Sequence, residues 1–409
     1  MENFIRKIPK SDLHVHLDGS VRPSTLIDIA KREKIKLPSF TEEGLNEVLF
    51  KDNYANLLEY LRCFDYTIPA MQTPENLERV AYEFAMDNIN EGVCYVEVRF
   101  APQFHMSKRM DIETILSSVA KGMDRAKAEY NNRPEVRSGV NPEFHYGIIV
   151  CAMRAFGRGL SEYFDMFLDA HKYSDQKMVH ALASYELAKA TVHTRDKLGL
   201  PIVAFDLAGA EAGNPAEDHK LAYHFAHKHF LHLTVHAGEA YGPESIFQAI
   251  TDLYADRIGH GYYLFDVGKV ADPEITDPVE YVRKLAQYIA DRRVTIEVCL
   301  TSNMQTNPAI GDIKNHQFRK MLDARLSTTL CTDNRTVSKT TVTKEILLAA
   351  EHFNLHGKPL KSLLVYGFKR SFFPGTYAEK RKYVRTVLDR YELLEAEMLK
   401  LPSQPGDDF

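Results

Sequence analysis

Strand-like and helix-like segments alternate eight times along this chain, and this alternation constrains the fold more than any other feature. The strand-like segments are short runs of apolar and β-branched residues, and the longer segments between them have helical periodicity. This order is typical of a parallel sheet covered by helices, either closed as a (β/α)8 barrel or open and doubly wound. We expect the strands near residues 12–17, 94–100, 145–152, 202–207, 232–236, 256–259, 294–299 and 327–332.

The chain has 409 residues, more than the roughly 250 of a simple barrel of this type. The additional length lies mainly at 20–90, around 155–200 and after the last strand, and no linker-like segment or internal repeat divides the sequence. Thr73 and Pro74 suit the N-cap and first position of one intervening helix. We therefore predict one α/β domain over 1–409, a (β/α)8 TIM barrel with additional helices inserted after strand 1 and at the C-terminus. The polar end SQPGDDF is expected to be frayed.

The composition favours a small-molecule partner. The formal net charge is -5, so no overall positive field attracts nucleic acid, and the basic run KRKYVR at 380–385 is expected to be a solvated helix face. No apolar stretch is long enough to cross a membrane, and the beginning of the sequence lacks a signal peptide's apolar core. The five cysteines have no CxxC spacing and are expected to be reduced core residues. We expect a cytoplasmic protein of undetermined oligomeric state.

Two histidines stand in the first strand, in the sequence DLHVHLDG. Alternation along a strand puts His14 and His16 on the same face, where two imidazoles can bind one metal ion. A pair of hydrogen-bonded histidines is the alternative interpretation of this motif alone.

Further polar residues stand at the predicted C-terminal ends of other strands. His236 ends the fifth strand with Glu239 just after it, His260 ends the sixth, and Asp333 and Asn334 follow the eighth. Taken singly, these residues could be a core histidine, a turn residue or a helix N-cap. Together they predict an active site, because barrel enzymes keep theirs at this end of the strands.

The residue types indicate one zinc ion per chain. Three neutral histidines (His14, His16 and His236) and the Asp333 carboxylate suit zinc, which would lower the pKa of a bound water toward ~7 and so favour hydrolysis. No lysine stands in the fourth-strand run PIVAFDLAG to bridge a second metal.

The motifs HVHLDGS, FDLAGAE, VHAGEA, RIGHG and TDN occur in an order and spacing that resemble the adenosine deaminase family over nearly the whole chain. The resemblance implies the same zinc ligands, with hydroxide attack at purine C6 and release of ammonia. Glu239 would protonate ring N1, His260 would orient or deprotonate the water, and Asp333 would take part in catalysis as well. Substrate contacts are implied for His16, Asp18 (ribose hydroxyl), Gly209 (its N–H to ring N3) and Asn334 (ring N7).

Two positions depart from the commonest family pattern. Asn334-Arg335 stands where many relatives have a second Asp followed by Pro, and Ala101 stands where relatives often have Ser. Purine N7 is an acceptor, and an amide NH₂ can donate to it without first taking up a proton. The change at Asn334 therefore preserves adenine recognition in principle.

Apolar residues between the first two strands form a helical stripe, with the spacing i, i+3, i+4 and i+7. In the family a helix here gates the cavity, although a helix packed on the barrel would show the same pattern. The expected lid contacts are Leu57, Tyr60, Leu61 and Phe64. Residues 301–303, after the seventh strand, are expected to provide supporting hydrogen bonds.

The resemblance predicts conversion of adenosine, and of 2′-deoxyadenosine, to inosine products in purine salvage. Glu239 must then be protonated when substrate binds, which a closed, water-poor pocket would favour. A nucleotide substrate would need cations near its 5′ phosphate, whereas Asp18 would repel it. Free adenine would leave Asp18 unused, and N6-modified substrates stay open. A catalytically silent nucleoside-binding protein is the alternative outside enzymes, although every zinc ligand and Glu239 are intact.

Overall fold

The computed structural model describes residues 2–400, so the prediction for the polar end SQPGDDF lies outside the described residues. Eight strands form one sheet in the order β1 to β8, and every neighbouring pair is parallel. The predicted TIM barrel is therefore confirmed, and the doubly wound alternative is wrong. The strands are β1 (Lys10–His16), β2 (Val93–Phe100), β3 (His145–Met153), β4 (Ile202–Ala208), β5 (His232–Ala237), β6 (Arg257–His260), β7 (Thr295–Val298) and β8 (Ser327–Leu330).

Asp333 closes the circle of strands directly after β8. It forms a parallel bridge with Val15, its N–H donates to the His14 carbonyl at 2.8 Å, and its own carbonyl accepts from the His16 N–H at 2.7 Å. The closure thus joins three candidate site residues through the backbone.

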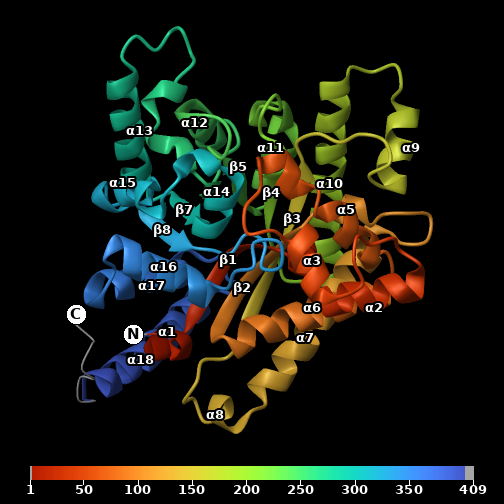
Figure 1. Cartoon of the computed structure of the whole chain (residues 1–409). Coiled ribbons are helices and arrows are strands. Elements are labelled where there is room, and N and C mark those ends of the chain that lie inside the picture. Colours follow the sequence, from red (N-terminus) through yellow and green to blue (C-terminus); the bar gives the residue numbers. More distant parts are fainter. Residues whose placement is uncertain (1, 401–409) are drawn as a thin grey trace.

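Helices surround the strands, as Figure 1 shows. The expected additional helices are present: α2 to α5 precede α6 between β1 and β2, and α17 and α18 end the described chain. The helices are α1 (Glu2–Lys7), α2 (Pro23–Glu33), α3 (Glu42–Val48), α4 (Leu57–Leu61), α5 (Phe64–Thr67), α6 (Pro74–Asn90), α7 (Ile112–Asn131), α8 (Pro134–Arg137), α9 (Glu162–Ala170), α10 (Gln176–Leu198), α11 (Lys220–Lys228), α12 (Pro243–Thr251), α13 (Pro278–Arg292), α14 (Leu300–Thr306), α15 (Phe318–Asp323), α16 (Val342–Phe353), α17 (Gly357–Arg370) and α18 (Tyr377–Lys400).

Local sequence explains where these helices begin. The Thr73 side chain accepts a hydrogen bond from the Asn76 N–H, and Pro74 takes the first position of α6, as predicted. None of the helices between residues 2 and 400 has the length and apolar composition needed to span a bilayer.

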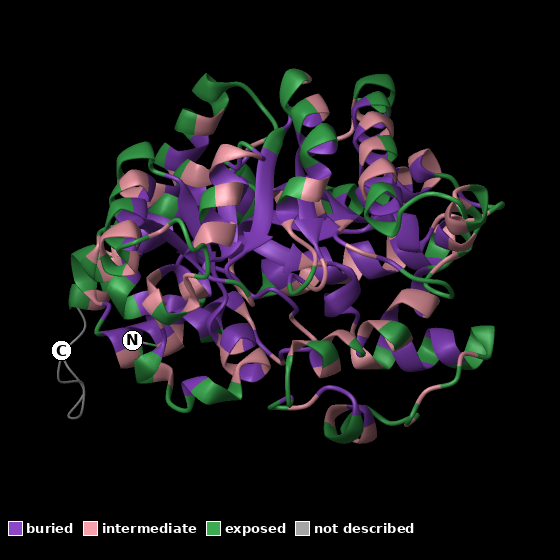
Figure 2. Cartoon of the chain, turned by 90° about the horizontal axis from the view of Figure 1, so that it is seen from above, coloured by how far each residue is buried: buried purple, intermediate pink, exposed green. Residues whose placement is uncertain are grey.

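Buried residues concentrate in the strands and on the inner faces of the helices (Figure 2). All five cysteines are buried and free, as expected. The barrel interior also contains buried charges, because Glu97, Arg99, Arg257 and Glu297 point inward from β2, β6 and β7 and pair with one another. The barrel therefore encloses a polar network beneath its C-terminal mouth.

Candidate active site

A cavity of about 550 Å³ opens at the C-terminal ends of the strands. Nearly all of the predicted site residues line it, including His16, Asp18, Glu239 and His260. Its outer part is mainly apolar, with side chains from the segment 57–69 and from the loop after β3. The cavity has the size and composition of a small-molecule site.

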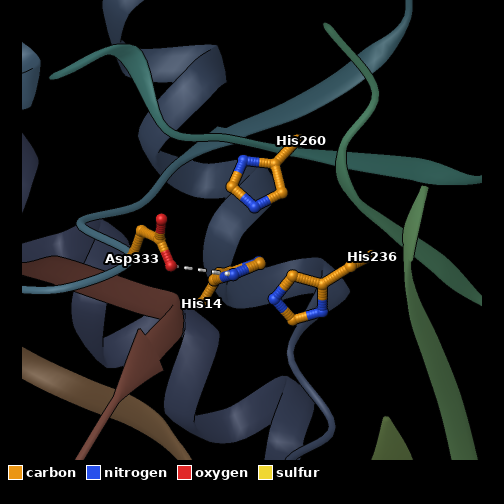
Figure 3. Close-up of side chains that lie close together, drawn as sticks. All are labelled: His14, His236, His260 and Asp333. Carbon is orange, nitrogen blue, oxygen red and sulfur yellow. Dashed lines mark ion pairs between the residues drawn. The ribbon is translucent and has the colours of Figure 1, made fainter. Parts of the chain in front are cut away.

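Four side chains with metal-binding atoms lie close together, as Figure 3 shows, and three of them (His236, His260 and Asp333) also line the cavity. One ligand atom from each of His14, His236, His260 and Asp333 lies within 4.8 Å of the others. The predicted ligand His16 is also close, since its Nε2 lies 3.1 Å from His236 Nε2 and 3.5 Å from Asp333 Oδ1. Two overlapping sets of four ligands are thus present.

Two of the histidines are oriented by buried carboxylates. His14 Nδ1 lies 2.7 Å from Glu297 Oε2, and His236 Nδ1 lies 3.1 Å from Asp206 Oδ2. A carboxylate accepts, so each Nδ1 carries the hydrogen and each Nε2 keeps its lone pair toward the common centre. The buried Nε2 of His14 has no hydrogen-bond partner, as expected of an atom that binds a metal ion.

The charges around these ligands also suit a divalent cation. Asp333 and three further carboxylates (Glu97, Asp206 and Glu297) belong to a buried network with two guanidinium groups, those of Arg99 and Arg257. Four negative groups against two positive ones leave two excess negative charges when the histidines are neutral. Burial disfavours ionised Asp333, but His14, His260 and His16 outweigh it and hold the pKa of this carboxyl well below its usual value.

Glu239 lies beside His260, with Oε1 3.8 Å from His260 Nε2. Burial, followed by repulsion from Asp333 and Glu211, raises the pKa of Glu239 to about 8. Burial of the carboxyl therefore favours its protonated form at neutral pH. This agrees with the expectation that a water-poor pocket would keep it neutral.

Glu211 holds the loop that carries Glu239. Its carboxylate accepts from the four consecutive N–H groups of residues 238–241, at 2.9, 3.0, 2.6 and 2.9 Å, and from Ser245 Oγ at 2.5 Å. Successive backbone N–H groups around one carboxylate form an anion-binding nest. The position of Glu239 thus depends on a charge contributed by another loop.

The predicted substrate contacts lie around the same cavity. Asp18 is 3% exposed, and its Oδ1 has no hydrogen-bond partner. Gly209 follows β4 with φ +96, a backbone conformation that favours glycine, and its Cα borders the cavity. Asn334 donates from Nδ2 to Tyr60 Oη at 2.8 Å, while its Oδ1 is buried without a partner. Ala101 also lines the cavity.

The expected lid contacts Leu57, Tyr60, Leu61 and Phe64 all line the cavity. The stripe is divided between α4 and α5 instead of lying on one helix, because the backbone tightens to i→i+3 hydrogen bonds around residues 62 and 63. Tyr60 is 1% exposed, and its hydroxyl lies 2.7 Å from Ser338 Oγ. This residue packs as part of the cavity wall in this conformation.

The predicted supporting hydrogen bonds after β7 are present. Ser302 Oγ donates to Asp333 Oδ2 at 2.6 Å, and Asn303 Nδ2 lies 3.1 Å from His260 Nδ1. Sequence reasoning gave no role to Glu211, Glu297, Asp206, Arg99 or His316. For three of them a sequence feature was available, since Arg99, Asp206 and Glu297 are charged residues within strands made mainly of apolar residues.

Residues 9–390 match the family model described as adenosine deaminase. The chain is 35% identical to an adenosine deaminase of Mycobacterium avium over 397 residues, which cover 95% of this chain and 97% of the relative. Among solved structures, a zinc-bound amidohydrolase from Burkholderia ambifaria has a TM-score of 0.75 at 18% identity, with 97% and 94% of the chains covered. The N6-methyl-AMP deaminase of Arabidopsis thaliana has a TM-score of 0.70 at 23% identity, with 95% and 98% covered.

Proposed function

Since the chain belongs to the adenosine deaminase family, we propose that it hydrolyses adenosine and 2′-deoxyadenosine to inosine and 2′-deoxyinosine, with release of ammonia. The observation that carries the proposal is one cavity in which Glu239 lies 3.8 Å from His260, beside the metal-binding group, and in which Asp18 presents a buried Oδ1 without a hydrogen-bond partner. An acid for a ring nitrogen and an acceptor for a hydroxyl are what a nucleoside requires.

The proposed reaction needs an activated water and a proton donor. When bound, a zinc ion held by His14, His16, His236 and Asp333 would supply an activated water at neutral pH. Glu239 donates its proton to purine N1, which weakens the ring's aromaticity and allows C6 to become tetrahedral. The amino group takes up one proton of the attacking water and leaves as ammonia, and the other proton of that water restores the Glu239 carboxyl.

Recognition of the substrate falls to other cavity residues. Asp18 accepts from a ribose hydroxyl, and the Gly209 N–H donates to ring N3. The Asn334 NH₂ group, which has a second hydrogen beyond the one given to Tyr60, donates to N7. These contacts fix the ring so that C6 faces the metal-binding group.

The charges of the cavity favour a nucleoside over a nucleotide. Of the described residues that line it, Arg62 alone carries a permanent positive charge, and it lies exposed at the outer edge. Asp65 and Asp333 line the same cavity, whereas burial raises the pKa of Asp18 to about 7 and that of Glu239 to about 8, so these two carboxyls add less negative charge at neutral pH. A 5′ phosphate would find no buried cation among the described lining residues to balance its charge.

The test is ammonia release by purified protein supplied with zinc. Adenosine, 2′-deoxyadenosine, adenine, AMP and N6-methyl-AMP are compared in parallel, each with a chelator-treated control. We expect chelator-sensitive turnover of the two nucleosides and at least 100-fold lower kcat/KM for AMP, on the scale of about 3 kcal/mol of discrimination. Faster turnover of N6-methyl-AMP or adenine than of adenosine would refute the proposed substrate and would assign the protein another substrate of the same family. Zinc binding without turnover would support a silent nucleoside-binding protein.

A further inference from the structure

A line of three buried side chains leads from the backbone of α15 to His260. The Phe318 N–H donates to His316 Nδ1 at 3.0 Å, His316 Nε2 lies 3.2 Å from Asn303 Oδ1, and Asn303 Nδ2 lies 3.1 Å from His260 Nδ1. His316 and Asn303 are each 2% exposed, and His260 is 1% exposed. The line is closed to solvent, so its hydrogen bonds must be satisfied internally.

The direction of every hydrogen bond in this line follows from its first donor. A backbone N–H can only donate, so His316 Nδ1 accepts and the hydrogen of this imidazole lies on Nε2. His316 Nε2–H then donates to Asn303, which must present its carbonyl oxygen. The opposite end of the same amide is an NH₂ group, and it donates to His260 Nδ1. No other assignment of the Asn303 amide satisfies both neighbours.

His260 therefore holds its hydrogen on Nε2, the atom that faces Glu239 and the metal-binding group. His14 and His236 have the reverse arrangement, with the hydrogen on Nδ1 and the lone pair on Nε2. An Nε2 that carries hydrogen cannot bind a metal ion and cannot take a proton from water. It can donate a hydrogen bond.

We propose that Asn303 and His316 are positioning residues that fix the tautomer of His260, so that His260 donates from Nε2 into the active site and is not a metal ligand. This proposal rests on the deaminase function for its kinetic consequence, but not for the tautomer itself. It selects His14, His16, His236 and Asp333 from the two overlapping ligand sets. Of the two roles expected for His260, it retains the orienting one and removes the role of base.

Backbone geometry supports a dedicated orienting role. His260 ends β6 with φ +64, an uncommon conformation for a residue other than glycine. Such a conformation persists where the surroundings hold the residue in place. The bond from Asn303 holds the ring in the direction that this backbone sets.

The direct test is nitrogen-15 NMR of the full-length protein labelled at histidine, with and without zinc, with His260→Gln used to assign the signals. We expect His260 to show a protonated Nε2 and an unprotonated Nδ1 in both states. A protonated Nδ1, or a direct zinc-induced shift of Nε2 typical of a ligand, would overturn the proposal. This measurement needs no substrate, so it stands even if adenosine is not turned over.

Two variants test the role of the line. Asn303→Asp replaces the NH₂ donor with a carboxylate, so the hydrogen of His260 should move to Nδ1 and kcat for adenosine should fall about 10²- to 10³-fold, the usual cost of one misplaced active-site donor. KM should change less than threefold. His316→Gln can keep the same order of acceptor and donor and should retain the wild-type tautomer. An unchanged tautomer in Asn303→Asp would refute the proposal, and the wild-type spectrum decides if this variant does not fold.

Zinc content gives an independent readout. His260→Gln should retain one zinc per chain, whereas His14→Gln should lose it, because His14 presents a lone pair to the metal and His260 does not. Loss of zinc from His260→Gln with correct folding would overturn the ligand assignment.

Discussion

Replacing Glu211 with Gln should loosen the loop that carries Glu239 without changing the size of the side chain. The Glu211 carboxylate is buried, 1% exposed, and accepts from the four N–H groups of residues 238–241. Three of these N–H groups donate to Oε2, while Gly238 and Ser245 donate to Oε1. An amide has one oxygen. In the best orientation of the glutamine, this oxygen accepts from the three N–H groups of residues 239–241, and the NH₂ group then faces the N–H of Gly238, which is left without an acceptor.

The magnitude follows from these contacts. An N–H left without an acceptor costs about 1–3 kcal/mol. The three remaining hydrogen bonds lose their charge assistance, and with it roughly half of their strength, which adds about 2 kcal/mol. The expected loss is about 4 kcal/mol. A chain of 409 residues has an unfolding entropy of about 0.9 kcal/mol/K, so Tm should fall by about 5 °C.

The assay combines calorimetry with kinetics. Ser245→Ala removes one donor from the same carboxylate and should lower Tm by only about 1–2 °C, which makes it the matched control. Displacement of Glu239 by about 1 Å should lower kcat for adenosine up to about 100-fold in the Glu211→Gln variant. A Tm within 1 °C of wild type together with unchanged kcat would refute the reasoning.

The pH dependence gives a second check on the same variant. Burial opposes ionisation of Glu211, but Arg154, Ser245 and the backbone N–H groups outweigh it and lower the pKa below the ordinary value of 4.5. A lowered carboxyl pKa stabilises the folded state fully above the unfolded pKa, and this contribution is lost as pH falls through the folded one. The Tm difference between wild type and variant should therefore be constant near neutrality and shrink below about pH 4.5. A Tm difference that stays constant below about pH 4.5 would contradict the conclusion that an ionised Glu211 carboxylate holds the loop.

Three further predictions concern the active site itself. Glu239→Gln should lower kcat about 10²- to 10⁴-fold with substrate binding retained. Wild-type kcat/KM should fall as pH rises through about 8, because the proton donor ionises there. A flat profile of kcat/KM to pH 9 would contradict the donor role. Zinc should raise the Tm of chelator-treated protein, since it binds the folded state, and His14→Ala should abolish this rise in differential scanning fluorimetry. Gly19→Ala would put a Cβ 1.8 Å from Asn334 Oδ1, so it should destabilise the protein by about 1–3 kcal/mol in denaturant unfolding and raise KM. Gly157→Ala serves as the control for adding a methyl group at a glycine, because Gly157 is exposed, has open space around its Cα and does not have a positive φ.

The fold could be predicted because the strands and their C-terminal residues carry local patterns. Each predicted strand overlaps an observed one, and the histidine pair of β1 alternates as the pleat requires. Closure of the barrel could not be predicted from the sequence of any single strand. It depends on Asp333, whose backbone bridges β8 to β1 and whose side chain faces the metal-binding group.

The residues that orient the site were not predictable in the same way. Glu211 follows β4 and acts on a loop 27 residues later, and His316 contacts Asn303 from the turn before α15. Neither position has a periodic pattern, since each is defined by a partner distant in sequence. The polar residues 301–303 predicted supporting hydrogen bonds, but the direction of these hydrogen bonds follows only from the complete line of contacts.

The buried charges and the backbone at the site both bear on metal binding. His260 and Asp333 both adopt positive φ, and the network beneath them has two excess negative charges in the barrel interior. Burying unbalanced charge is unfavourable unless a cation or protons neutralise it. Protonating Asp333 would remove a ligand, and protonating His14 would occupy the Nε2 lone pair that faces the centre. A divalent cation balances the charge while leaving both groups in their binding forms, so this network of buried charges favours metal binding.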